Sequence, residues 1–234
     1  MKVAVLSDLH LSRPTASCGF GCDAAQLMAV LDRIEATHEA LLLAGDIFDL
    51  NVRERFCDPR DEWRAAREAW RPLVERLERL CLAQVYGNND HQLAREGFPE
   101  VAVLQAAGTR LVMMHGHQFE PAAAWLMDLK ATVKWVAAWN QRHGMPALGD
   151  ALYRANSAVS RNRPTRLDPL TRQALAYLAQ HPEVHILVCG HSHYPRVEKT
   201  AWGIYANAGA CSFGRLDWLS IDLAAREVHC HTCS

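Results

Sequence analysis

The chain contains short apolar runs of strand length, and most of them end in a cluster of Asp, His or Asn side chains. Such runs cover residues 3–6, 40–44 and 82–86, with further runs at 101–104, 110–114 and 184–189. Patterns with helical spacing separate several of them, at residues 23–36 and at 61–80, where Pro72 interrupts the pattern. Strands that alternate with helices predict a mostly parallel sheet with helices on its faces.

The C-terminal third changes character. Asp168-Pro169 is a typical helix start, and that helix is expected to run to about residue 180. From Arg196 onward the pattern is all-β, with turns near Gly203 and Gly214. This part therefore predicts a second sheet packed on the first, with helices outside. We expect one α/β domain over residues 1–234, because a chain of 234 residues is long enough to bury a full core.

The stretch at about 118–165 does not follow the alternation, because it carries no strand signal. Residues 121–141 predict a helix with Trp125 and Trp139 at helical spacing, and 151–160 predict a second helix. We interpret the stretch as a helical insertion that lies over the site as a lid. The alternative is a helix pair that only packs on the core, which is the commoner role of tryptophans at this spacing.

Five clusters of metal-ligand residue types follow predicted strands. They are Asp8-Leu9-His10, Gly45-Asp46-Ile47-Phe48-Asp49, Gly87-Asn88-Asn89-Asp90, His115-Gly116-His117 and Gly190-His191-Ser192-His193. A single cluster of this kind is usually a turn or a satisfied core histidine. Five clusters at strand ends instead predict one site at the carboxyl edge of the sheet.

The ligand types indicate the metal. Carboxylates, imidazoles and an amide oxygen suit manganese, iron or zinc, and suit magnesium less well. The set is larger than one ion needs, so we expect two divalent ions, with manganese as the first choice. Metal pairs of this kind activate water and hold a phosphate group during in-line attack.

These blocks strongly resemble the calcineurin-like metallophosphoesterases, in the same order from Asp8 to His193. The resemblance implies a two-sheet αββα sandwich. It also implies two metal sites that share Asp46 as the bridging residue. One site would consist of Asp8, His10, Asp46 and His193, and the other of Asp46, Asn88, His115 and His191. Asp49 and Asp90 would orient these ligands.

One position departs from the family pattern. Members often have a histidine after the metal-binding asparagine, where it can protonate the leaving group or hold the phosphate, and here that position is Asn89. An amide can donate a hydrogen bond to a phosphate oxygen but is a poor general acid. Asn89 and His117 are therefore the candidate catalytic residues, and for His117 a role in packing at the site edge stays open.

Several blocks and the helical insertion are similar to the UDP-2,3-diacylglucosamine hydrolase branch of the family. That branch implies cleavage of a pyrophosphate in a lipid-linked nucleotide, with UMP released. The arginines of the insertion, Arg154, Arg161 and Arg163, would then contact the substrate, although for any single arginine a solvated basic face is the better explanation. Two alternatives remain: a general phosphodiesterase acting on cyclic nucleotides or other small diesters, and a catalytically inactive binding scaffold.

Composition limits the partners. The chain has 25 basic and 26 acidic residues, and this balance gives no steering toward nucleic acid. Its apolar runs are too short for a membrane span or a signal-peptide core, so we expect a cytoplasmic protein, with peripheral membrane contact if its substrate is lipid-linked. Cys18, Cys22, Cys230 and Cys233 are expected to be free thiols, with a zinc knuckle as the alternative.

Overall fold

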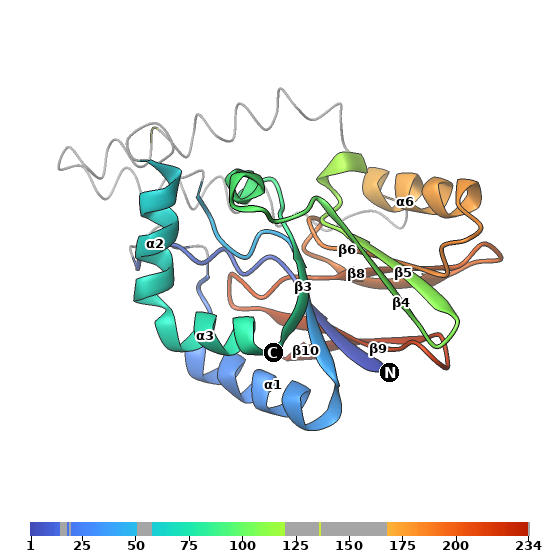
Figure 1. Cartoon of the computed structure of the whole chain (residues 1–234), viewed down its shortest axis with the longest axis horizontal. Helices are drawn as coiled ribbons and strands as arrows, with labels where there is room; N and C mark the ends of the chain where they lie inside the picture. The colour runs from blue at the N-terminus through green and yellow to red at the C-terminus, as the bar shows by residue number, and fades with distance from the viewer. Residues whose placement is uncertain (15–17, 19, 51–57, 120–135, 137–167, 234) are drawn as a thin grey trace.

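The fold is known from a computed structural model of the whole chain, shown in Figure 1. It describes all residues except 15–17, 19, 51–57, 120–135, 137–167 and 234. The predicted insertion at about 118–165 therefore lies almost entirely outside the described residues. No helix in the part of the chain that is described is both long and apolar enough to cross a membrane.

Two five-stranded sheets form the centre of the molecule. The first has the order β10-β9-β1-β2-β3 and the second the order β4-β5-β6-β8-β7. The strands of the first sheet are β1 (Lys2–Leu6), β2 (Ala40–Ala44), β3 (Cys81–Val85), β9 (Leu216–Asp222) and β10 (Glu227–Cys233). Those of the second are β4 (Val101–Ala106), β5 (Thr109–Met114), β6 (Ile186–Cys189), β7 (Pro195–Lys199) and β8 (Ile204–Ala208).

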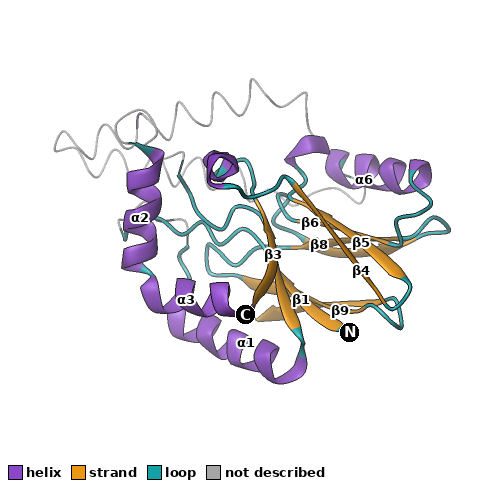
Figure 2. Ribbon diagram, in the orientation of Figure 1, coloured by secondary structure: helices purple, strands orange, loops and turns teal. Residues whose placement is uncertain are grey.

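Helices cover the two outer faces of this sandwich, as Figure 2 shows by colour. On the first sheet lie α1 (Ala24–Thr37) and α3 (Arg71–Leu80), and α2 (Pro59–Ala69) precedes α3. The second sheet carries α6 (Pro169–Gln180), and two short 3-10 helices, η1 (His91–Glu96) and η2 (His117–Phe119), follow strand ends. The predicted two-sheet αββα sandwich is confirmed.

Alternation of side chains along the strands creates the layers. In β2, Leu41 and Leu43 pack with α1 and α3, whereas Leu42 faces the second sheet. In β5, Met113 points between the sheets and Val112 packs under α6. These central strands are thus apolar on both faces, which is typical of strands that helices cover.

The local sequence explains the helix ends. Asp23 and Asp168 cap α1 and α6 by accepting backbone N–H bonds from Ala25 and Thr171. Pro72 lies in the first turn of α3, where its missing N–H costs nothing, so the predicted 61–80 helix becomes two helices that meet at Trp70.

The parallel strands set the position of the site. In the first sheet β1 pairs in parallel with β2 and β2 with β3, and in the second β5 pairs in parallel with β6. Each of these five strands is followed by one of the five clusters predicted from the sequence. The fold therefore brings all five to the carboxyl ends of parallel strands, where ligands bind in open α/β sheets.

Candidate metal centre

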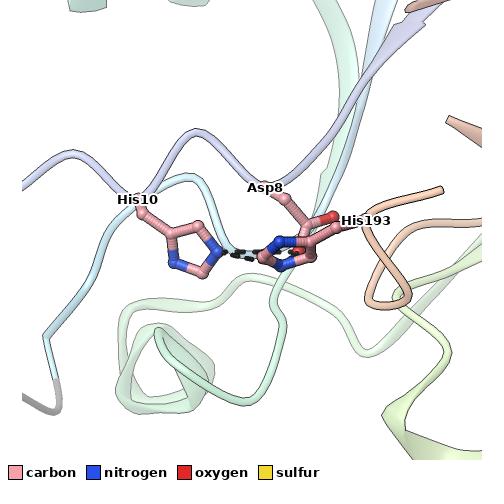
Figure 3. Close-up of side chains that lie close together, drawn as sticks. All are labelled: Asp8, His10 and His193. Atoms are coloured by element: carbon pink, nitrogen blue, oxygen red, sulfur yellow. Dashed lines mark hydrogen bonds and ion pairs between the residues drawn. The ribbon is translucent and has the colours of Figure 1, made fainter. Parts of the chain in front are cut away.

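Asp8, directly after β1, lies at the centre of the first group of side chains. Its Oδ1 atom is 3.1 Å from His193 Nε2 and 3.7 Å from His10 Nε2, and the two histidine Nε2 atoms are 3.3 Å apart. Figure 3 shows Asp8 and His10 on one segment, after β1, and His193 approaching them from a second segment. Their ligand atoms lie close enough together for one metal ion to touch all three.

The second group joins Asp8 to Asp46 and His115, and all three are buried. His115 Nε2 lies 3.3 Å from Asp46 Oδ2 and 4.0 Å from Asp8 Oδ1. The same Asp46 oxygen is 4.0 Å from His10 Nε2, so Asp46 belongs to the second group and also lies near a histidine of the first.

Two atoms test whether this set fits a metal. Asp8 Oδ1 and His115 Nε2 are fully buried, and apart from the ion-pair contacts within the two groups they have no hydrogen-bond partner. Buried polar atoms are almost always satisfied, so such a pair facing one point is the expected sign of a metal ligand set. His115 Nδ1 donates to the Ala44 carbonyl at 2.9 Å, which leaves Nε2 as the coordinating atom. The residues fit a divalent ion.

The charges of these groups depend on one another. Burial would lower the pKa of His115, yet the carboxylates of Asp46 and Asp8 raise it to about 10. Burial likewise opposes ionisation of Asp46, but His115 holds the pKa of that carboxyl well below its usual range. Burial also opposes ionisation of Asp8, but His193 and His115 lower the pKa of that carboxyl. Both aspartates are therefore ionised at neutral pH, which is the form that binds a cation.

The backbone around the centre is strained. Asp8, His10, Asp46, His191 and His193 all have positive φ angles, between 52° and 67°. Non-glycine residues seldom adopt this left-handed conformation, and clusters of it occur at functional sites, where the surrounding structure holds it in place. The conformation turns the chain sharply after each strand and directs the side chains to a common point.

Glycines make room for the same side chains. A Cβ atom on Gly87 would lie 2.2 Å from Asp46 Oδ1, and one on Gly190 would lie 1.9 Å from Ser7 Oγ. The backbone of both loops thus approaches the ligand carboxylates more closely than any side chain permits.

His191 and Asn89 contact residues of the two ligand groups. The backbone N–H of His191 donates to Asp8 Oδ2 at 3.0 Å, and its ring is 5.2 Å from that of His115. Asn88 begins the loop after Gly87. Asn89 donates its backbone N–H to Asp46 Oδ1 at 2.8 Å and its side-chain amide to Asp46 Oδ2. Asn89 therefore positions the Asp46 carboxylate.

Asp49 and Asp90 are both buried beside the centre. Asp90 accepts N–H bonds from Gly87 at 2.6 Å and from Ile47 at 2.9 Å, so it joins the loop of Asn88 to the loop of Asp46. Burial, together with repulsion from Asp46, raises the pKa of Asp90 to about 7. Asp49 donates its backbone N–H to the Leu11 carbonyl at 3.0 Å, beside the His10 block.

His117 lies at the edge of the centre. Its ring is 5.6 Å from that of His115 and 6.4 Å from that of His191. Its Nδ1 atom is buried without a hydrogen-bond partner. Burial, and then the positive charge of His115, lower the pKa of His117 to about 4, so the ring is neutral at neutral pH.

Other predicted residues are not part of this geometry. Arg154, Arg161 and Arg163 lie outside the described residues. Cys18 Sγ and Cys22 Sγ donate weak hydrogen bonds to the carbonyls of Ser12 and Arg215. Neither of the two metal-ligand groups found among the described residues contains a cysteine.

Two supporting residues escape sequence reasoning. Ser7 donates its hydroxyl to Asp8 Oδ2, and Asn207 in β8 donates its amide to the Gly190 carbonyl. Both are almost fully buried. Asn207 could have been identified from the sequence, because it is a polar residue inside an apolar strand run.

The chain was compared with known proteins. A model of the calcineurin-like phosphoesterase superfamily domain matches residues 1–138. A search of curated proteins finds no match.

Two solved structures of Vps29 show the same fold at low sequence identity. Vps29 from Chaetomium thermophilum is 12% identical, with 100% of this chain and 97% of that one covered and a TM-score of 0.53. A single mutant of Vps29 from Entamoeba histolytica is 15% identical, covers 100% and 98%, and has a TM-score of 0.51. The phosphoesterase YfcE from E. coli is 18% identical, covers 100% and 98%, and has a TM-score of 0.46. With a family model matching more than half of it, this chain belongs to the calcineurin-like phosphoesterase superfamily.

Proposed function

We propose that this protein hydrolyses a phosphodiester or pyrophosphate bond with two divalent metal ions. The observation that carries the proposal is the pair of ligand groups that share Asp8 and have Asp46 between them. Two ions held there would lower the pKa of a bound water and neutralise charge on the phosphate oxygens. Carboxylates and imidazoles without thiolate favour manganese for both positions, with iron, zinc or magnesium as the alternatives.

The proposed ligand sets are those that the family resemblance implies. Asp8, His10, Asp46 and His193 would hold one ion, and Asp46, Asn88, His115 and His191 the other. Asn89 holds the bridging carboxylate with two hydrogen bonds, and Asp90 fixes the spacing of the two loops that carry Asp46 and Asn88. These residues act by preorganising the ligands, so that little rearrangement is needed when the ions bind.

His117 is the residue we propose to contact the substrate. Its neutral ring lies beside two of the proposed ligand histidines, and its buried Nδ1 atom is unsatisfied. A neutral imidazole can donate a hydrogen bond to the leaving-group oxygen. Asn89 is less suited to this task because its amide is engaged with Asp46.

The substrate is proposed to be a pyrophosphate-linked nucleotide of the UDP-sugar type, which can be lipid-linked. The support is the similarity of the sequence blocks to the UDP-2,3-diacylglucosamine hydrolase branch. A substrate of this kind has a good leaving group, which suits a site without a histidine at position 89.

The test compares two substrates side by side. The protein is stripped of metal with a chelator, reloaded with manganese, and assayed on UDP-2,3-diacylglucosamine and on bis(p-nitrophenyl) phosphate. Release of UMP well above the diester rate supports the nucleotide substrate. Turnover of bis(p-nitrophenyl) phosphate alone supports phosphodiester hydrolysis but rejects the lipid-linked substrate. Absence of turnover on both, with manganese bound, rejects the proposed activity.

A further inference from the structure

The loop between β8 and β9 holds an aromatic side chain against the candidate centre. Phe213 has a φ angle of 54°, and Gly214 after it has 78°, so two consecutive residues are left-handed. A bulky residue in this conformation is uncommon and is kept only where the surroundings enforce it.

Hydrogen bonds to a distant segment fix this loop. The Phe213 N–H donates to the Phe20 carbonyl at 3.1 Å, and Cys22 Sγ donates to the Arg215 carbonyl at 3.1 Å. Phe20 is almost fully buried, so the partner segment is itself anchored. The strained Phe213 is therefore held in a defined place.

The Phe213 ring lies on one side of the metal centre. Its centroid is 6.2 Å from that of His193, with the two rings nearly parallel at 24°, and 6.1 Å from that of His10. These are the two histidines of the group in Figure 3. The side chain of Phe213 is partly exposed beside these two histidines.

Arg215 brings a positive charge to the same side. Its guanidinium lies 5.1 Å from the ring centroid of Tyr194, the residue after His193, and forms an ion pair at 2.7 Å with Asp217. Asp217 is fully buried, whereas the Arg215 side chain keeps about a third of its surface exposed, at 35%. The buried carboxylate and the ring fix the guanidinium, and its exposed edge retains donors for a further anion.

We propose that Phe213 and Arg215 form a subsite for the organic part of the substrate, which rests on the proposed function. Phe213 stacks on a planar ring, and Arg215 binds a negative charge beyond the phosphoryl group at the metals. The chemical class that offers both is a nucleotide with at least two phosphate groups. An aromatic ring stacks on any base, so the subsite favours ligands that carry a base but does not distinguish one base from another.

Binding of product-like probes tests the subsite without turnover. The manganese-loaded protein is titrated calorimetrically with methyl phosphate, UMP and UDP. We expect UMP to bind about tenfold more tightly than methyl phosphate because of the stacking contact, and UDP to bind more tightly still. Equal affinity for UMP and methyl phosphate overturns the proposal.

Two variants assign the two contacts. Phe213→Leu should remove the preference for UMP over methyl phosphate and leave methyl phosphate affinity unchanged. Arg215→Gln should remove the preference for UDP over UMP. The proposal fails if Phe213→Leu still prefers UMP over methyl phosphate, or if Arg215→Gln still prefers UDP over UMP. It also fails if Phe213→Leu weakens the binding of all three probes equally, because Phe213 would then only support the histidines.

Matched controls lie at the other end of the sheets. Trp202→Leu removes an exposed aromatic from the β7–β8 turn, and Arg226→Gln removes an arginine that bonds the Gly108 carbonyl. Both should keep the wild-type order of affinities. A protein that prefers UDP but cleaves no ester would refute the proposed activity and leave this subsite standing, so the two failures are distinguishable.

Discussion

His115 Nε2 and Asp46 Oδ2 lie 3.3 Å apart in a fully buried pair, and the pKa of His115 is raised to about 10. Burial opposes this increase, and the carboxylates of Asp46 and Asp8 cause it. Without metal, protonated His115 therefore supplies part of the positive charge that the cation would bring to these carboxylates. Metal binding must displace that proton because only the neutral nitrogen coordinates.

The first prediction concerns this proton. At pH 8.5, which is below about 10 and well above the usual histidine pKa, manganese binding should release about one proton. Affinity should rise about tenfold per pH unit from pH 7 to 9, because the competing proton is lost as the pH increases. Calorimetry in two buffers of different ionisation enthalpy counts the proton. Equal heats in the two buffers at pH 8.5 would contradict it.

The second prediction concerns Asp46, whose carboxylate lies between the two ligand groups. Asp46→Asn keeps the size of the side chain but removes the negative charge, so both ions should lose a ligand and turnover should fall by more than about 100-fold. The circular dichroism spectrum should not change, because the backbone partners of this loop are retained. An Asp46→Asn protein with near-normal activity and two bound ions would show that the ligand assignment is wrong.

Much of the framework follows from the sequence because it depends on local patterns. The helix predicted at 23–36 is found at Ala24–Thr37, and the expected interruption at Pro72 separates α2 from α3. The clusters after strands converge because parallel strands share one carboxyl edge. The boundaries are less accurate: the strand predicted at 184–189 begins only at Ile186, because Val184 bonds back to the His181 carbonyl in a turn.

The finer parts of the site depend on contacts between distant residues, which no local pattern encodes. The hydrogen bonds from Asn89 to Asp46 could not be predicted, because they form only where the loop after β3 folds against the loop after β2. The role of Asn89 toward the substrate stays a prediction. The Phe213 ring lies near the His10 ring because the β8–β9 loop places it there, although the two residues are far apart in the sequence. The left-handed backbone of Asp8 and His191 is not predictable from the sequence, because Asp and His adopt positive φ more often than most residues but still only in a minority of positions.

The third prediction concerns Asp90, which accepts three backbone N–H bonds, from Ile47, Phe48 and Gly87. An asparagine has one acceptor oxygen, so Asp90→Asn turns an NH2 group toward an N–H donor. Manganese affinity should fall about 10- to 100-fold, the usual effect of losing a residue that orients metal ligands. Equilibrium dialysis measures the affinity.

Asp23→Asn, at the exposed cap of α1, is the control and should bind metal normally. Normal affinity in Asp90→Asn would show that Asp90 does not set the loop spacing.

The last prediction separates steric pressure on the site from backbone strain. Gly87 has no positive φ angle, but a Cβ there would lie 2.2 Å from Asp46 Oδ1. Gly97 has a φ angle of 90° and nothing within 4 Å of its Cβ position. Gly87→Ala should therefore displace Asp46 and reduce activity at least about tenfold. Gly97→Ala should cost about 1 kcal/mol of stability through its left-handed backbone and leave activity unchanged. The activity and the thermal stability are measured for each of the two variants. Equal activity in the two variants would mean that the contact between Gly87 and Asp46 does not position the carboxylate.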